Sequence, residues 1–365
     1  MMNRIIGAYI EITGQCNEKC PYCYNEKLMQ ECNELPVEII SKLSDELLEM
    51  GITAITLSGG EPFLHAGINR ILKISKEKGI RITAISNGTC FHPDYMGILL
   101  TYSPSLQLTF DGYDQKTHDA TRGLGNFERL TMGYYKARQL GYNGSVSIRI
   151  NLHQKNVSEL GSILDMISRV FEVDTDNSVV SSISLSYVHK ADWHDDRFDA
   201  IILPEQYGNQ IEISNSIKAW NSMHRIQIKD ITSEPDIGCP FNGEKASVDC
   251  GIRIAINGDV FPCQLFSDPQ FCIGNVYSTS IQEIANGESM SQFLQLIKGR
   301  HANIPKCSQC AFHGVCGSGC PGQAFGLYGT LYAITERCAE RKVKLSNKLR
   351  KVFDSAVQLS QRQIE

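Results

Sequence analysis

Apolar and polar positions follow two different rhythms along the first half of the chain. Short runs rich in β-branched and aromatic residues predict six strands, at residues 8–13, 52–58, 80–86, 105–110, 145–151 and 183–188. Between them, apolar residues recur at helical spacing, as they do at 37–47, 127–137 and 157–167. Strands that alternate with helices are typical of βα units around a parallel sheet. This periodicity fits either part of a barrel or an open doubly wound sheet.

The pattern changes after residue 190. A polar loop with Trp193 and His194 and a helix starting near Gln206 are interpreted as a connector over 191–236. Gly, Pro and Cys then become frequent, and the predicted helices and strands become short. The exception is a hairpin predicted over 252–261. The last stretch is predicted to be helical from about residue 335. We therefore divide the chain into 1–190, a connector over 191–236, a Cys-rich domain over 237–340 and a C-terminal helix over 341–365.

Length and charge exclude several classes of protein. The 365 residues are 42% hydrophobic and 21% charged, with a formal net charge of −5, which is ordinary for a globular protein of about two domains. No basic excess indicates a nucleic-acid partner. The longest uncharged apolar runs are far shorter than a membrane span, and the N-terminus lacks a signal-peptide pattern. We expect a soluble cytoplasmic protein with neither nucleic-acid nor membrane partners.

Fourteen cysteines are the unusual feature of the composition. A cytosolic chain of this size makes little use of disulfides, so grouped cysteines favour metal ligation. The first group, Cys16-x3-Cys20-x2-Cys23, directly follows the first predicted strand. Structural zinc takes four protein ligands, whereas three thiolates on a four-iron cluster leave one iron open. A zinc site with a borrowed fourth ligand is the alternative.

The three-cysteine loop resembles the motif of the radical S-adenosylmethionine (radical SAM) superfamily, including the aromatic Tyr22 before the third cysteine. Residues at the ends of the next two strands resemble further family motifs, namely Gly59, Gly60, Glu61 and Pro62 after the second strand and Ser86 and Asn87 after the third. The resemblance implies an α/β fold, a partial (β/α)6 barrel. It also implies that the open iron chelates SAM, whose reductive cleavage gives a 5′-deoxyadenosyl radical.

The residues themselves support these assignments. Gly59 and Gly60 allow a ligand to approach the backbone, and Glu61 can accept hydrogen bonds from an ammonium group. An ordinary βα turn is the alternative. Arg122, after the fourth strand, is a candidate partner for the SAM carboxylate, because guanidinium groups bind carboxylates in a bidentate manner. A surface ion pair would explain Arg122 equally well.

The second half resembles the SPASM domain, a small α+β extension that carries auxiliary iron–sulfur clusters. The resemblance implies two [4Fe–4S] clusters with interlaced ligands. One set is Cys239, Cys250, Cys263 and Cys320, and the other is Cys307, Cys310, Cys316 and Cys338. The spacing before Gly258 is irregular, so either Cys239 or Cys250 could be a bystander. Two zinc ribbons are the alternative, because Cys-x2-Cys pairs alone do not select iron over zinc.

Three cysteines, Cys32, Cys90 and Cys272, lie outside these groups. Cys90 follows Asn87 near the strand ends, where a thiol could return a hydrogen atom to a substrate radical. Packing in the core is the alternative reading. A basic run near the C-terminus, which includes Arg337, could attract an acidic peptide, although such a face is usually only solvated.

The resemblance implies an enzyme that modifies a ribosomal peptide, by crosslinking or by epimerisation. Its cofactors would be three [4Fe–4S] clusters and SAM. Sulfatase maturation is the second hypothesis. It is less favoured because that subfamily has an Asp base at the position where this chain has Gln264. A non-catalytic iron–sulfur electron carrier is the alternative of another class, and it would not need Gly59, Gly60 and Glu61. Since the first strand begins near residue 8, we expect no N-terminal leader-recognition domain and allow for a separate leader-binding protein. A low-potential donor such as flavodoxin or ferredoxin would supply electrons.

Overall fold

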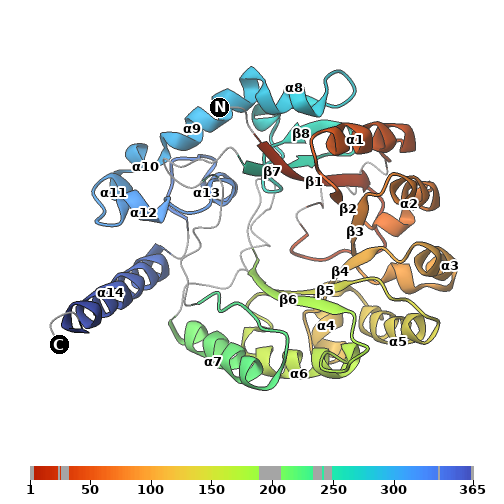
Figure 1. Ribbon diagram of the computed structural model, residues 1–365, viewed down its shortest axis with the longest axis horizontal. Coiled ribbons are helices and arrows are strands. Elements are labelled where there is room, and N and C mark those ends of the chain that lie inside the picture. The colour runs from red at the N-terminus through yellow and green to blue at the C-terminus, as the bar shows by residue number, and fades with distance from the viewer. Residues whose placement is uncertain are drawn as a thin grey trace.

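The computed structural model describes residues 4–23, 25, 33–188, 207–232, 241, 249–335 and 338–362. Strands and helices alternate through its first half (Figure 1). They are β1 (Arg4–Thr13), α1 (Val37–Glu49), β2 (Ala54–Gly59), α2 (Ile68–Glu77), β3 (Arg81–Ser86), α3 (Pro93–Tyr102), β4 (Ser105–Thr109), α4 (Gln115–Arg122), α5 (Asn126–Gln139), β5 (Val146–Leu152), α6 (Leu160–Phe171) and β6 (Val180–Tyr187). The six predicted strands are confirmed within a few residues at each end.

The sheet decides between the two architectures that the sequence left open. Strands β1 to β6 are all parallel and lie side by side in chain order. A doubly wound sheet would reverse its direction at a switch point, and this run of strands does not. Figure 1 shows the sheet curling with helices on its outer side. The partial α/β barrel is therefore confirmed.

Helix α1 shows how the sequence determines where a helix begins and ends and which of its residues are buried. Val37, Ile40, Leu43 and Leu47 recur at helical spacing and are all buried. Pro36 precedes the first turn, where a missing N–H costs nothing. Gly51, just beyond the end, has a φ of +80°, a conformation that glycine adopts without a steric penalty.

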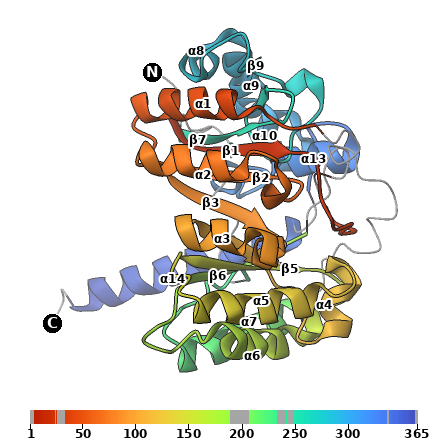
Figure 2. The ribbon, with the colours of Figure 1, turned by 90° about the vertical axis from the view of Figure 1, so that its right-hand side faces the viewer.

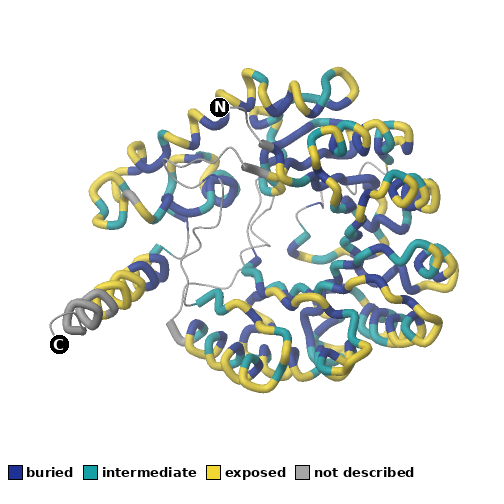
Figure 3. The backbone as a smooth tube through the Cα atoms, in the orientation of Figure 1, coloured by how far each residue is buried: buried dark blue, intermediate teal, exposed yellow. Residues whose placement is uncertain are grey.

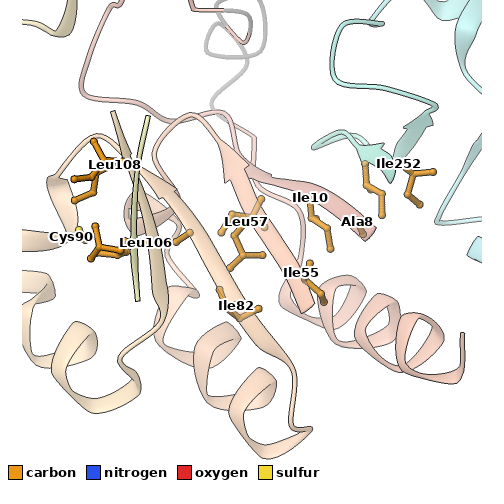
Figure 4. Close-up of a cluster of buried hydrophobic side chains, with 14 of the residues drawn as sticks. Ala8, Ile10, Ile55, Leu57, Ile82, Cys90, Leu106, Leu108 and Ile252 are labelled. Atoms are coloured by element: carbon orange, nitrogen blue, oxygen red, sulfur yellow. The ribbon is translucent and has the colours of Figure 1, made fainter. Parts of the chain in front are cut away.

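The main core lies between the sheet and the surrounding helices. Figure 4 shows side chains from neighbouring strands meeting there, among them Ile10, Leu57, Ile82 and Leu106, all of which are buried. Strand β5 alternates buried and half-buried residues along its length. This alternation is expected of a sheet whose outer face packs against helices.

The second half begins by extending the first sheet. β7 (Asp249–Ile254) pairs in parallel with β1, and β8 (Asp259–Phe261) and β9 (Gly274–Asn275) follow in antiparallel order. The whole sheet has nine strands in the order β6-β5-β4-β3-β2-β1-β7-β8-β9. The predicted hairpin is thus confirmed, but its first strand also belongs to the barrel sheet. The sequence did not reveal that continuity.

A buried ion pair crosses this junction. Arg253 of β7 donates from Nε and Nη2 to the two carboxylate oxygens of Glu11 in β1, at 2.8 and 2.9 Å. Its Nη1 donates to the Phe266 carbonyl oxygen and to Ser267 Oγ. Both Glu11 and Arg253 are at most 1% exposed. The two halves of the molecule are therefore joined by backbone pairing and by a bidentate ion pair.

Short helices follow the hairpin and precede a long terminal one. They are α8 (Ile281–Asn286), α9 (Glu288–Lys298), α10 (Arg300–Asn303), α11 (Pro305–Ser308), α12 (His313–Cys316), α13 (Pro321–Tyr328) and α14 (Cys338–Arg362). Helix α14 projects beyond the other elements in Figures 1 and 2.

The connector helix predicted from Gln206 is α7 (Tyr207–Met223). Trp193 and His194 lie outside the described residues. No helix in the described part of the chain has the length and apolar character of a membrane span.

Candidate functional site

The loop after β1 brings the first three cysteines together. The backbone N–H of Cys23 donates to the Cys20 carbonyl at 3.0 Å, which closes the turn between them. Burial raises the pKa of Cys16 to about 11 and that of Cys23 to about 12, and the neighbouring thiols contribute in the same direction. Three thiols that repel one another when ionised call for a cationic partner.

No three His, Cys, Asp or Glu side chains among the described residues lie close enough to share one metal ion. A tetrahedral zinc site needs such convergence, whereas each thiolate of a four-iron cluster binds a different iron. The donor set of the loop, three thiols in the short segment from Cys16 to Cys23, therefore fits three ligands of a four-iron cluster.

Gly59 and Gly60 hold this loop in place. Gly60 N–H donates to the Thr13 carbonyl, and Glu61 N–H donates to the Gln15 carbonyl, both at 2.7 Å. A Cβ on Gly59 would lie 2.2 Å from the Thr13 oxygen, and one on Gly60 would lie 2.1 Å from the Gln15 oxygen. The loop itself therefore approaches these two glycines closely, and the approach of a ligand to them stays a prediction.

Glu61 is buried and already hydrogen-bonded. It accepts from Asn87 N–H at 2.8 Å, from Ser86 Oγ at 3.0 Å and from Phe63 N–H at 3.2 Å. Burial raises its pKa to about 7. The carboxylate thus ties the end of β2 to the end of β3, and its contact with an ammonium group stays a prediction. Pro62, also buried, begins the short turn that follows.

Asn87 connects the third strand to the cysteine loop. Its Nδ2 donates to Asn17 Oδ1 at 2.9 Å, and its Oδ1 accepts from Thr89 N–H at 3.0 Å. Asn126 at the start of α5 donates from Nδ2 to the Asn87 carbonyl. The motif residues of β2 and β3 therefore meet the loop of β1 at one edge of the sheet.

Arg122 lies at the same edge, buried beside Tyr22. Its Nη1 donates to the Tyr22 hydroxyl at 3.3 Å, and that hydroxyl donates to Asp111 Oδ2. Burial raises the pKa of Asp111, and Arg122 opposes that shift. The Nε of Arg122 is buried without a hydrogen-bond partner, so this guanidinium has a donor to spare for a ligand. This placement rules out an exposed surface ion pair.

Two further side chains at this edge were missed by sequence reasoning. Asn25 donates from Nδ2 to the Gly59 carbonyl at 2.7 Å, while its Oδ1 is buried without a partner. His153, at the end of β5, accepts from Lys155 N–H at Nδ1, which assigns the ring proton to Nε2. Burial lowers the pKa of His153 to about 4 and keeps the ring neutral.

His153 Nε2 also lacks a partner, and its ring centroid lies 5.9 Å from that of Tyr22. Buried polar groups normally find partners. The orphaned atoms of Asn25, Arg122 and His153, one acceptor and two donors, therefore fit a polar ligand bound beside the cysteine loop. The sequence signal that could have identified His153 as a site residue is its position as a polar residue directly after a predicted parallel strand.

The later cysteines stay predicted ligands. The pKa of Cys338 is raised by burial, which Arg341 and Lys342 oppose, and Cys316 and Cys307 also contribute to the rise. Cys310 N–H donates to the Cys307 carbonyl at 3.1 Å. These cysteines belong to one of the two predicted ligand sets.

The other set is described only in part. Cys263 and Cys320 are half-buried. Cys250 belongs to β7, in register with Ile5 of β1. Cys239 and Cys32 lie outside the described residues.

Cys90 is placed in the core. It is 0% exposed and packs between the sheet and the helices, close to Leu106 in Figure 4. Its pKa is raised, chiefly by burial. This environment favours packing over exchange of a hydrogen atom with a substrate.

Comparison with known families matches two segments of the chain. Residues 10–167 match the model of the radical SAM superfamily, and residues 247–311 match an iron–sulfur cluster-binding domain, SPASM. The first segment contains the cysteine loop and the ends of the first five strands. The second contains the hairpin that extends the barrel sheet.

Individual proteins are similar over most of the chain. The subtilosin biosynthesis protein AlbA of Bacillus subtilis is 27% identical over 86% of this chain and 66% of its own length, so this chain spans about two thirds of AlbA. An AdoMet-dependent heme synthase of Nitratidesulfovibrio vulgaris is 23% identical over 92% of both chains. The crystal structure of Streptococcus suis SuiB bound to the precursor peptide SuiA superposes with a TM-score of 0.67 at 14% identity, over 93% of this chain and 76% of SuiB.

Proposed function

Since this chain is a radical SAM enzyme with a SPASM domain, we propose that it modifies a ribosomal peptide by abstracting a hydrogen atom from a C–H bond. The observation that carries the SAM site is the set of orphaned buried atoms beside the three-cysteine loop. The peptide substrate is supported by likeness to AlbA and to peptide-bound SuiB.

The chain's own residues would hold SAM as follows. Cys16, Cys20 and Cys23 bind three irons of a [4Fe–4S] cluster, and the fourth iron is left for the cofactor. Arg122 Nε donates to the SAM carboxylate, and Asn25 Oδ1 accepts from its ammonium group. Bound SAM supplies a 5′-deoxyadenosyl radical after one-electron reduction by a donor such as flavodoxin or ferredoxin.

His153 and Tyr22 complete this site. Val188, directly after β6, packs on Tyr22 together with Cys20 and provides an apolar surface. His153 Nε2–H would donate to an acceptor on the adenosyl part of the cofactor. The low pKa of the imidazole keeps that proton in place as a hydrogen-bond donor at neutral pH.

The auxiliary clusters give the substrate radical an electron acceptor. We assign Cys239, Cys250, Cys263 and Cys320 to one [4Fe–4S] cluster and Cys307, Cys310, Cys316 and Cys338 to the other. Neither cluster then has an open iron. Crosslinking would remove two electrons and two protons from the peptide, as one hydrogen atom taken by the adenosyl radical, one proton released to solvent and one electron for which a bound cluster would be the acceptor. The burial of Cys90 favours this oxidative outcome over epimerisation.

The iron content gives a direct check. Three clusters on eleven cysteines predict about twelve irons per chain, and replacing Cys16, Cys20 and Cys23 with Ala leaves about eight. The same triple variant should release no 5′-deoxyadenosine when supplied with SAM and dithionite. Zinc as the main metal of anaerobically purified protein would contradict the assignment.

The substrate is sought as a short reading frame beside the gene of this enzyme, and the peptide that such a frame encodes, called the encoded peptide below, is the one to test. The anaerobic enzyme with SAM and dithionite should lower the mass of that peptide by two, and the triple Cys variant should leave it unchanged. No mass change together with deuterium uptake from solvent would indicate epimerisation instead.

A second candidate is supported by the heme synthase, which matches over nearly the full length of both proteins. Two further reactions of the anaerobic enzyme with SAM and dithionite are therefore run in parallel. One contains a haem precursor in place of the encoded peptide, and the other contains a sulfatase peptide. Turnover of either one, with no change in the encoded peptide, would overturn peptide crosslinking.

A further inference from the structure

A groove of about 580 Å³ runs between α7 and α14. Ile211, Ser214 and Lys218 line it from α7, and Val343 and Asn347 line it from α14. In Figure 1 both helices lie on the open side of the curled sheet. A volume of this size is typical of sites that bury a ligand of several residues.

The groove adjoins the edge of the sheet where the cysteine loop lies. Gln210, which also lines it, donates from Nε2 to the Tyr187 hydroxyl at 3.1 Å. Tyr187 is the last residue of β6, and the next residue, Val188, packs on Tyr22 beside Cys20. These contacts connect the lining of the groove to Tyr22 and thus to the side of the proposed SAM site.

The groove offers both apolar and basic contacts. Ile211 and Val343 are apolar yet about half exposed, at 48% and 49%. Lys218 of α7, which also lines the groove, is exposed, and Lys344 of α14 lines it with its Nζ donating to the Ile231 carbonyl oxygen at 2.7 Å. Among the described residues that line the groove, the acidic one is Glu340, which is buried.

Charge complementarity indicates what the groove binds. Beyond the groove, residues 346–354 of α14 are exposed on all sides of the helix, and they include the basic residues Lys348, Arg350 and Lys351 and the apolar residues Leu349, Val352 and Phe353. Figure 3 shows this part of α14 as exposed. The chain as a whole has a net charge of −5, so this basic surface is a local feature. Basic and apolar groups together suit a partner with acidic and apolar side chains.

We propose that the groove between α7 and α14 binds a segment of the peptide substrate that flanks the modified residue and carries apolar and acidic side chains. This rests on the proposed peptide substrate and adds where and how that peptide is held. Exposed apolar residues on two facing helices would then be covered only when substrate is bound.

The test introduces a charge into the groove. Val343→Glu should raise the KM for the encoded peptide about tenfold, because it exchanges apolar burial for a desolvated, repelling carboxylate. The kcat and the release of 5′-deoxyadenosine without peptide should stay within about twofold of wild type. Met132→Glu is the matched control, since Met132 is 63% exposed on α5, outside the groove, and it should leave KM unchanged.

Charge recognition is tested by a double-variant cycle. Lys218→Glu should raise KM at low salt, and the effect should shrink at high salt. Changing the acidic residues of the peptide to Gln should raise KM for wild type but not for this charge-reversed enzyme. Additive effects would contradict direct contact.

The outcomes separate the two proposals. If wild type modifies the peptide and Val343→Glu does so with the same KM, the groove proposal is wrong and the proposed function stands. If Val343→Glu dissociates a dimer of this chain without changing KM, the groove is an interface between two copies and not a peptide site. If wild type does not modify the peptide but converts a haem precursor, both proposals fall.

Discussion

Replacing Arg253 with Met tests how the two halves of the molecule are held together. Methionine keeps most of the apolar stem but removes the guanidinium that pairs with Glu11 across β1 and β7. Glu11, 0% exposed, then becomes a buried carboxylate without its cation. Breaking a buried pair from one side costs about 3–5 kcal/mol. The lost hydrogen bonds to Phe266 and Ser267 act in the same direction.

The assay is anaerobic thermal unfolding of the cluster-loaded enzyme. A loss of that size lowers Tm by roughly 4–7 °C in a chain of this length. Arg225→Met is the matched control, because Arg225 forms an ion pair with Asp176 at 3.3 Å in which both side chains are exposed. Exposed pairs contribute at most about 1 kcal/mol.

The pH dependence identifies the cause. Burial raises the pKa of Glu11, and Arg253 opposes that shift, so removing Arg253 raises the pKa of Glu11 further. The added cost belongs to the ionised carboxylate, so it is absent below the unfolded pKa and grows as the pH rises through the folded one. The difference in Tm between Arg253→Met and wild type should therefore be larger at about pH 8.5 than at about pH 6. A loss no greater than that of Arg225→Met, at either pH, would refute the reasoning.

Three further substitutions test the site. Gly60→Ala places a Cβ 2.1 Å from the Gln15 carbonyl oxygen and should abolish SAM cleavage, whereas Gly7→Ala meets no atom within 4 Å and should not; equal rates would contradict the proposed packing of the loop. Cys90→Ser should lower the free energy of unfolding by about 1–3 kcal/mol and leave the peptide product unchanged, and loss of product with SAM cleavage intact would show that Cys90 is the hydrogen donor. Because the pKa of Glu61 is raised from 4.5 to about 7, the stability linked to its protonation is complete below 4.5 and is lost as the pH rises through 7. The stability of Glu61→Gln relative to wild type should therefore increase from about pH 5 to pH 8 in chemical denaturation, and a constant difference would contradict the buried carboxylate.

The barrel half was predictable because its information is local. Strand and helix periodicity, with Pro36 and Gly51 around α1, placed elements within a few residues. The pairing of β7 with β1 depends on contacts between residues far apart in the sequence, such as Glu11 and Arg253, and no local pattern announces it. Spacing could suggest a hairpin, but it could not show which other strand that hairpin joins.

The sequence predicted which residues belong to the candidate site better than it predicted the role of each residue there. Cys16, Cys20 and Cys23 were identified by spacing, and the residues around them by motif. Whether Glu61 faces a ligand or its own backbone depends on which donors surround it in space. The orphaned atoms of Asn25 and His153 are likewise properties of packing, since either residue could have found a partner in another fold.

The position of β1 in the sheet means that the sheet cannot be completed until β7 has been synthesised. β1 is made before the other described strands, yet one of its two neighbours is β7, which is made much later. The sheet of β1 to β6 is finished with Tyr187, and roughly 60 residues separate its completion from Asp249 of β7, which is about 3–12 s at about 5–20 residues per second. Throughout that interval the finished β1–β6 sheet would present an unpaired edge, the kind of surface that recruits strands from other chains. Slow translation between the two halves would lengthen this exposure, and prompt arrival of β7 would end it.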